Sequence, residues 1–104
     1  DADDPLTAII REAMEETGYR IDRADYLFDA YMSPGTLTER VSFFAAEIDA
    51  SHKVGKGGGL EEEGEDIEIL EIPLADAYEM IGSGRICDGK TIMLLQWAKM
   101  KYGI

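Results

Sequence analysis

Apolar side chains at the beginning of the chain follow the spacing of an amphipathic helix. The apolar stripe consists of Leu6, Ile9, Ile10, Ala13 and Met14. We expect the helix to run from Pro5 to Thr17, because proline is favoured at the first helical position and Gly18 supplies a C-terminal stop. Asp3 or Asp4 is the expected N-cap. The pattern predicts one face toward a core and one polar face toward solvent.

Two strand-like segments follow this helix. Residues 19–32 mix aromatic and acidic side chains, and residues 37–48 are rich in apolar ones, including Phe43 and Phe44. The tripeptide Ser33-Pro34-Gly35 lies between them and predicts a turn. We therefore expect an antiparallel hairpin.

The second half of the chain begins with a polar stretch, residues 49–66. Glycines at 55, 57, 58 and 59 precede an acidic run there, which predicts a flexible, solvated loop. Residues 67–72 alternate apolar and acidic side chains, so we expect a half-exposed strand that ends at Pro73.

Two further helices are expected after that strand. The first spans residues 76–83 and is closed by Gly82 and Gly84, with Ala77, Met80 and Ile81 facing inward. The second spans residues 90–101 and is apolar over most of its surface. Its apolar residues are Ile92, Met93, Leu94, Leu95, Trp97 and Met100. Helices and strands together predict an α+β fold.

Composition excludes several partners. The chain has 104 residues, of which 45% are hydrophobic, enough for the core of one domain. Ten basic against 22 acidic residues give a net charge of −12, which disfavours nucleic-acid phosphates and anionic membrane surfaces. No apolar run approaches the ~20 residues of a membrane-spanning helix. We expect neither nucleic acid nor a membrane as partner.

The single cysteine and the single histidine give little support to nucleophilic catalysis. Cys87 has no second cysteine in these residues with which to form a disulfide, which suits a reducing cytoplasm. His52 lies in the glycine- and lysine-containing loop. We expect both residues to serve packing or a solvated loop.

Three carboxylates near the end of the first helix are the strongest chemical signal. Glu12 and Glu16 are four residues apart and share a helix face, and Glu15 lies beside them. Like charges at this spacing cost a helix roughly 0.2–0.5 kcal/mol per pair, so a compensating cation is expected. Oxygen ligands favour a hard ion, Mg²⁺ or Mn²⁺. On spacing alone, a solvated acidic face remains an equal alternative.

The string REAMEETGY, residues 11–19, resembles the core of the Nudix box, G-x5-E-x7-R-E-U-x-E-E-x-G-U, where U is bulky and apolar. Ala13 is smaller than usual, Asp3 stands where the box has its first Glu, and the leading Gly would precede residue 1. The resemblance implies that residues 1–104 are the C-terminal part of a Nudix domain and start inside the box. The implied fold is an α/β/α sandwich with a mixed sheet, whose N-terminal strands are missing from this chain.

Further segments resemble one branch of this family. YMSPGTLTE, GGGLEEEGEDIEILEIP and DGKTIMLL are similar, in order, to segments of bacterial GDP-mannose pyrophosphatases. The resemblance implies a cytoplasmic, homodimeric, Mg²⁺-dependent enzyme, with Mn²⁺ as a possible substitute, that cleaves a nucleotide sugar, GDP-mannose, into GMP and mannose 1-phosphate.

Three alternatives remain beside that function. The proline-bearing turn is also similar to that of ADP-ribose pyrophosphatases, which would produce AMP and ribose 5-phosphate. A Nudix-fold binding module without hydrolysis is the second alternative, although its members usually lose the glutamates present here. An acidic calcium-binding protein is the third, but no D-x-[DN]-x-[DN]-G loop is present.

The resemblance also implies roles for individual residues. Glu12 and Glu16 match the metal ligands, Glu15 is the third box carboxylate, and Arg11 would hold the glutamates by a bidentate ion pair. A further metal-binding or catalytic glutamate is expected from the acidic loop, where Glu65 matches best and Glu63 competes with it. We expect the glycine-rich loop to carry Glu65 over the site as a lid.

The implied substrate contacts are Glu16, Glu39 and Lys90. Glu39 follows the proline turn, and Lys90 belongs to the DGKT segment. Two structural alternatives stay open, since Lys90 would also suit the start of a helix and Glu39 the exposed face of a strand. The base specificity, the number of metals and the dimer geometry do not follow from these residues.

Overall fold

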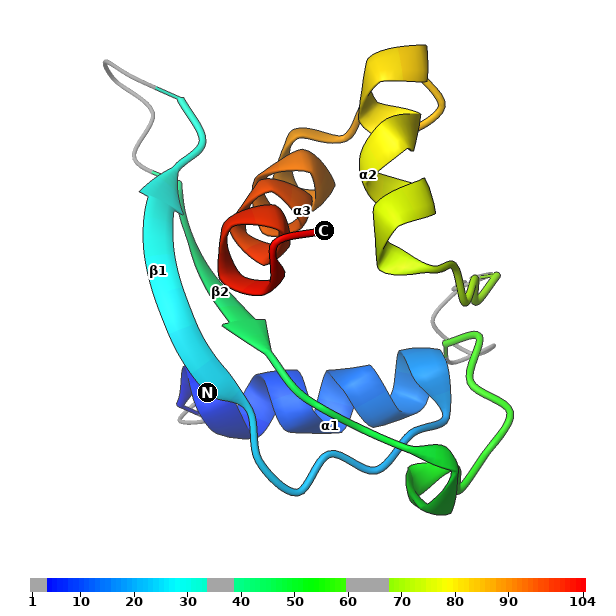
Figure 1. Ribbon diagram of the computed structural model, residues 1–104. Helices are drawn as coiled ribbons and strands as arrows, with labels where there is room; N and C mark the ends of the chain where they lie inside the picture. The colour runs from blue at the N-terminus through cyan, green and yellow to red at the C-terminus, as the bar shows by residue number, and fades with distance from the viewer. Residues whose placement is uncertain (1–3, 34–38, 60–67) are drawn as a thin grey trace. The chain divides into compact units, whose positions relative to one another are not determined.

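The structure, a computed structural model, describes residues 4–33, 39–59 and 68–104. Its elements in chain order are α1 (Pro5–Thr17), β1 (Asp25–Tyr31), β2 (Arg40–Ala45), the short 3₁₀ helix η1 (Ala50–His52), α2 (Leu74–Ser83) and α3 (Gly89–Tyr102) (Figure 1). The mixed α+β class is therefore confirmed. The chain forms two compact units, Asp1–Ile69 and Leu70–Ile104, and each is described by itself.

Helix α1 has the predicted bounds because both of its ends are capped. At the start, Asp4 Oδ1 accepts a hydrogen bond of 2.8 Å from the Thr7 N–H, and Pro5 follows as the first helical residue. At the end, Gly18 has φ 78° and donates its N–H to the Met14 carbonyl. Of the two predicted N-caps, Asp4 is confirmed and Asp3 lies outside the described residues.

Strands β1 and β2 form the predicted antiparallel hairpin. Pairing runs from Asp25 with Ala45 to Tyr31 with Arg40, and the register shifts between Tyr26 and Phe28. The strands are shorter than residues 19–32 and 37–48, because residues 19–24 contribute only one bridge, between Tyr19 and Lys53. Two residues of the predicted turn, 34 and 35, are outside the described part of the chain.

Apolar side chains lie on both faces of the hairpin, because Phe43 and Phe44 are consecutive in β2 and point to opposite sides. Phe43 is only 4% exposed and stacks beside Phe28, with the ring centroids 4.7 Å apart. Apolar residues of α1 and β2 border a small cavity of ≈ 180 Å³. Leu6 and Met14 belong to the predicted stripe but are 42% and 44% exposed. They lie at the margins of the stripe, and neither borders this small cavity, although Leu6 lines a second, larger groove beside the hairpin.

The strand predicted at residues 67–72 is wrong for its described part, residues 68–72. These residues form no strand, and the sheet of the described residues has the order β1-β2 only. Alternating side chains show that a segment is half-buried, but a strand also needs a neighbour to accept and donate its backbone hydrogen bonds. Within the described parts of the chain, this segment has no such neighbour.

In the second unit, α2 and α3 pack against each other. Their most buried residues are both alanines, Ala77 and Ala98, whose small side chains allow close packing. Lys99 Nζ also lies 5.1 Å from the centre of the Tyr78 ring, a cation–π contact between the two helices. Helix α2 begins two residues earlier than predicted, directly after Pro73. The bounds predicted for α3 are correct to one residue at each end.

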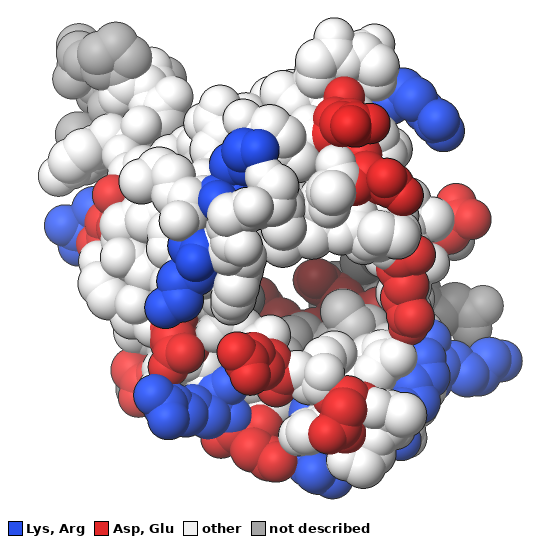
Figure 2. Space-filling model, in the orientation of Figure 1, with Lys and Arg blue, Asp and Glu red and all other residues white. Residues whose placement is uncertain are grey.

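Charges are mixed on the visible surface. Figure 2 shows basic side chains interleaved with acidic ones on the face that it presents. Within residues 4–33, 39–59 and 68–104, no helix has the length and apolar character needed to cross a bilayer.

Candidate metal-binding helix and its surroundings

The glutamates of helix α1 differ in exposure, because Glu12 is exposed whereas Glu15 and Glu16 are half-buried. Ile9, Ile10 and Ala13 border the cavity toward the hairpin, whereas the Glu12 side chain is 52% exposed. Glu16 lies one turn after Glu12 on the same face. A ligand could therefore approach Glu12 from solvent, whereas Glu16 is half-buried.

The donor chemistry of this pair fits a hard divalent cation. Carboxylate oxygens are the ligands that Mg²⁺ prefers, and Mg²⁺ usually takes only one or two of them from a protein, with water and substrate phosphates completing its coordination. In the part of the chain that the structure describes, no group of three or more His, Cys, Asp or Glu residues is arranged so that it could hold a metal ion. Glu12 and Glu16 are thus a partial ligand set, and the competing candidates Glu63 and Glu65 lie outside the described residues.

Arg11 is close to one of these glutamates. Its Nη2 atom lies 3.9 Å from Glu12 Oε2, beyond normal hydrogen-bond length, and both side chains are about half exposed. An exposed pair at this distance contributes about 0–1 kcal/mol to stability. A bidentate role for Arg11 remains a prediction.

The C-terminal end of α1 is covered by a distant part of the chain. Residues 52–59, here named the docked segment, run along residues 15–20. The backbone hydrogen bonds join Arg20 N to His52 O (2.7 Å), Val54 N and Gly55 N to Gly18 O (2.8 and 3.0 Å), Gly58 N to Glu16 O (2.7 Å) and Gly59 N to Glu15 O (3.0 Å). The predicted loop is therefore solvated at residues 53–56, which are exposed, but its backbone is hydrogen-bonded to residues 15–20.

Close backbone approach explains the glycines of the docked segment. Gly57, Gly58 and Gly59 all have positive φ, which side chains disfavour. A Cβ atom on Gly57 would lie 2.8 Å from the Glu16 carbonyl oxygen and 2.4 Å from Ile69 Cδ1. The glycine run was visible in the sequence, and it signalled close packing rather than flexibility.

His52 occupies a polar cluster at the start of the docked segment. Its Nε2 lies 3.4 Å from Asp22 Oδ2, its Nδ1 lies 3.1 Å from Asp49 Oδ1, and its side chain is 18% exposed. The Arg20 side chain hydrogen-bonds Asp22 and lowers the pKa of that carboxyl, with His52 as a smaller cause. The solvated-loop alternative for His52 is thus wrong and the packing alternative is correct. The Asp49–His52 spacing, which forms a capping box, was the missed signal.

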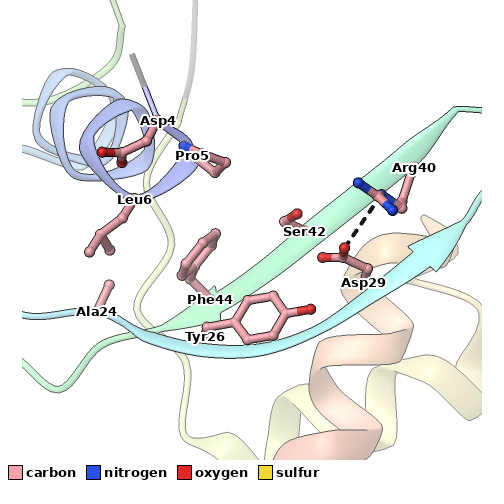
Figure 3. A pocket seen from close by; sticks show the side chains of 9 residues that line it. All are labelled: Asp4, Pro5, Leu6, Ala24, Tyr26, Asp29, Arg40, Ser42 and Phe44. Atoms are coloured by element: carbon pink, nitrogen blue, oxygen red, sulfur yellow. Dashed lines mark ion pairs between the residues drawn. The ribbon is translucent and has the colours of Figure 1, made fainter. Parts of the chain in front are cut away.

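A shallow groove of ≈ 430 Å³ lies between the start of α1 and the face of the hairpin that carries Phe44 (Figure 3). In it, Arg40 Nε is 3.4 Å from Asp29 Oδ2. A hydrogen bond from Ser42 is the main cause that lowers the pKa of Asp29, and burial is the main cause that raises the pKa of Tyr26, followed by its hydrogen bond to Asp29. These four polar groups therefore partner one another.

Lys90 and Glu39 are both exposed at the beginnings of elements. Lys90 Nζ donates to Asp88 Oδ1 at 3.1 Å, and Asp88 also caps α3 by accepting from the Thr91 N–H. The hydrogen bond from the Thr91 backbone is the main cause of the lowered pKa of Asp88, followed by that from Lys90. Glu39 directly precedes β2, and its carbonyl accepts a hydrogen bond from the Met32 N–H. Lys90 belongs to the unit Leu70–Ile104, whereas Glu39 and the glutamates of α1 belong to Asp1–Ile69.

Comparison with known proteins places this chain beside one group of enzymes. No protein-family model matches it. It is 57% identical over 94 residues to the GDP-mannose pyrophosphatase of Pectobacterium atrosepticum, which covers 90% of this chain and 48% of that protein. The proteins of the same name from Yersinia pestis (strain Pestoides F) and Yersinia enterocolitica are 53% and 55% identical, over 98% and 96% of this chain and 50% and 51% of their own lengths. The chain thus spans about half the length of the curated relatives it matches.

Proposed function

We propose that this chain is the metal-binding part of a Nudix hydrolase that cleaves the pyrophosphate bond of GDP-mannose. The observation that carries the proposal is the identity of 53–57% to GDP-mannose pyrophosphatases over nearly the whole chain. The Glu12 and Glu16 pair on α1, of which Glu12 is exposed and Glu16 half-buried, supports it, because such a pair suits the cation that pyrophosphate hydrolysis requires. The Nudix fold with its mixed sheet is part of the same proposal.

Glu12 and Glu16 would hold the metal, Mg²⁺ or in its place Mn²⁺. When bound, a divalent ion neutralises phosphate oxygens and lowers the pKa of a water molecule. The helix keeps the two carboxylates one turn apart, and the Glu12 side chain is open to solvent. Attack of water on one phosphorus of the bridge would release GMP and mannose 1-phosphate.

Other residues are proposed to support this step. Glu15 would bind a further ion or orient water, and Arg11 would position the glutamates. Glu65, with Glu63 as the competing candidate, would supply the additional metal-binding or basic carboxylate. These roles rest on the resemblance of the box and of the acidic loop to the family.

Substrate contacts are proposed for Glu16, Glu39 and Lys90. The Lys90 ammonium suits a phosphate or a sugar hydroxyl because it is a compact cation with three donors. It is 53% exposed and held by Asp88, so it is accessible to such a ligand. A homodimer in the cytoplasm completes the proposal.

A product assay on the full-length protein tests the proposal. GDP-mannose, ADP-ribose and a dinucleotide are offered separately, with and without Mg²⁺, and the products are identified by chromatography. We expect Mg²⁺-dependent release of GMP and mannose 1-phosphate well above the cleavage of the other two. Preferred cleavage of ADP-ribose would overturn the substrate but not the chemistry. Absence of all cleavage would favour a binding module.

A further inference from the structure

We infer that the docked segment is a positioning element for the metal-binding turn of α1, and that Gly57 is the residue on which this positioning depends. The inference rests on the proposed function, in which Glu12 and Glu16 bind a divalent cation. It assigns a role to residues that lie outside the helix and are not themselves ligands.

The first argument concerns the last turn of α1. The last four carbonyl groups of a helix have no partner within the helix, so this turn frays unless other groups bond to them. Here the carbonyls of Glu15 and Glu16 accept hydrogen bonds from Gly59 and Gly58. Two of the three box glutamates are therefore fixed through their own backbone by residues more than 40 positions later in the chain.

A comparison within the molecule shows that this bonding is specific to α1. At the end of α2, the Ile81 and Met80 carbonyls accept hydrogen bonds from Gly84 and Ile86, which directly follow the helix. Such local bonds close a helix without any distant segment. The additional long-range bonds at α1 lie where the proposed ligands are.

The second argument is steric. Gly57 has φ 74°, and a Cβ atom there would lie 2.5 Å from the Thr17 carbonyl carbon and 2.8 Å from the Glu16 carbonyl oxygen. Both are backbone atoms, which cannot move aside as the end of a flexible side chain can. Only glycine at this position allows Gly58 and Gly59 to reach their carbonyl partners.

The consequence for metal binding is preorganisation. Glu16 is the second-last residue of α1, so its carboxylate lies one turn from that of Glu12 only while this last turn stays helical. A site whose ligands are already ordered binds its ion more tightly, because less conformational freedom is lost on binding. The docked segment would thus raise the affinity for the cation while contributing no ligand.

Titration of the full-length protein with Mn²⁺ alone, monitored by the paramagnetic signal of free Mn²⁺, tests this inference. We expect Gly57→Ala to weaken Mn²⁺ binding by about tenfold. Losing a group that orients metal ligands typically weakens metal affinity by a factor of this size. The matched control is Gly84→Ala, which has the same unfavourable backbone conformation, φ 85°, but no atom within 4 Å of the new Cβ. We expect this control to bind Mn²⁺ like the wild type.

Glu12→Gln separates this inference from the proposed function. If Mn²⁺ binding by the wild type does not depend on Glu12, the metal site is wrong and the inference fails with it. If Glu12→Gln weakens binding but folded Gly57→Ala, checked by circular dichroism, binds Mn²⁺ with wild-type affinity, only the inference is overturned.

Hydrogen exchange on the wild-type protein covers the case in which Gly57→Ala does not fold. We expect the Gly58 and Gly59 amides to be protected, and their exchange to slow further when Mg²⁺ is added. Exchange at the rate of an unstructured peptide, with or without Mg²⁺, would show that the docked segment does not hold the helix and would overturn the inference.

Discussion

Helices α1 and α2 end in the same local way but in different surroundings. Each is amphipathic, and each ends at a glycine in the left-handed region, Gly18 with φ 78° and Gly84 with φ 85°. A Cβ on Gly18 would lie 2.3 Å from the Gly55 carbonyl oxygen, whereas a Cβ on Gly84 would have no atom within 4 Å. A left-handed glycine can therefore be a simple helix stop in one place and a packing surface in another.

The largest expected effect is a difference in kcat between variants of a glutamate in α1 and a glutamate in α2. We expect Glu12→Gln in α1 to lower kcat by about 100-fold or more, because a metal ion contributes several kcal/mol to stabilising the transition state. The matched control is Glu79→Gln, which removes an exposed glutamate from α2 and should leave kcat unchanged. Steady-state kinetics with GDP-mannose measures both, and equal kcat values for the two variants would contradict the proposed site.

The next-largest effect is a difference in stability between alanine substitutions at the two helix ends. We expect Gly18→Ala to lower the free energy of unfolding by about 3 kcal/mol. Alanine is strained in the left-handed backbone conformation, and its Cβ atom would overlap the Gly55 backbone. Urea unfolding followed by circular dichroism measures this loss. Gly84→Ala should lose only about 1 kcal/mol, since it has the backbone cost without the overlap. Equal losses would show that Gly18 is not packed against the docked segment.

Both helix ends show what the sequence could and could not predict. Pro5, Gly18 and the apolar spacing were enough to place α1 and its caps, because these signals act within a few residues. The docking of residues 52–59 was not predicted, since it depends on which distant carbonyls face the glycines. The strand expected at residues 67–72 failed for the same reason, because its ladder partners do not follow from its own pattern.

In the candidate site too, local features could be predicted from the sequence and long-range contacts could not. The spacing of Glu12, Glu15 and Glu16 placed all three on α1 from sequence alone. The polar cluster around His52 was missed, because its partner Asp22 lies 30 residues away in the chain. No spacing rule predicts such a contact.

A smaller effect is expected from the second unit. Lys90→Met keeps the length of the side chain but removes its charge. We expect this variant to raise KM for GDP-mannose by about tenfold with little change in kcat, because it loses one charge-assisted hydrogen bond to the substrate. Lys101→Met is the matched control, because it removes an exposed charge from the last turn of the same helix, α3. An unchanged KM for Lys90→Met would assign Lys90 to the start of the helix only.

The smallest effect concerns acid stability, for which the helix starts of the two units should behave alike. The pKa of Asp4 and that of Asp88 are both lowered, in each case mainly by a backbone N–H of the helix that the residue caps, from Thr7 and Thr91. A carboxyl whose pKa is lower in the folded state contributes stability above its unfolded value of 3.8, and this contribution is lost as the pH falls through the folded value.

Asp88→Asn tests this expectation because asparagine caps a helix without titrating. Below pH 4, we expect Tm to fall less steeply in this variant than in the wild type. Thermal melts between pH 7 and pH 3 measure the difference, and parallel curves would show that the charge of Asp88 does not contribute to stability.

The contact between Gly57 and Ile69 has a consequence for how this protein tolerates insertions. The Ile69 side chain lies against Gly57, and Gly59 is bonded to Glu15, so the described residues on both sides of the acidic stretch are held near the same end of α1. A loop whose ends are already fixed together loses only about 0.6 kcal/mol of stability when its length doubles. An insertion between residues 59 and 69 should therefore cost little stability and leave α1 and its glutamates unchanged.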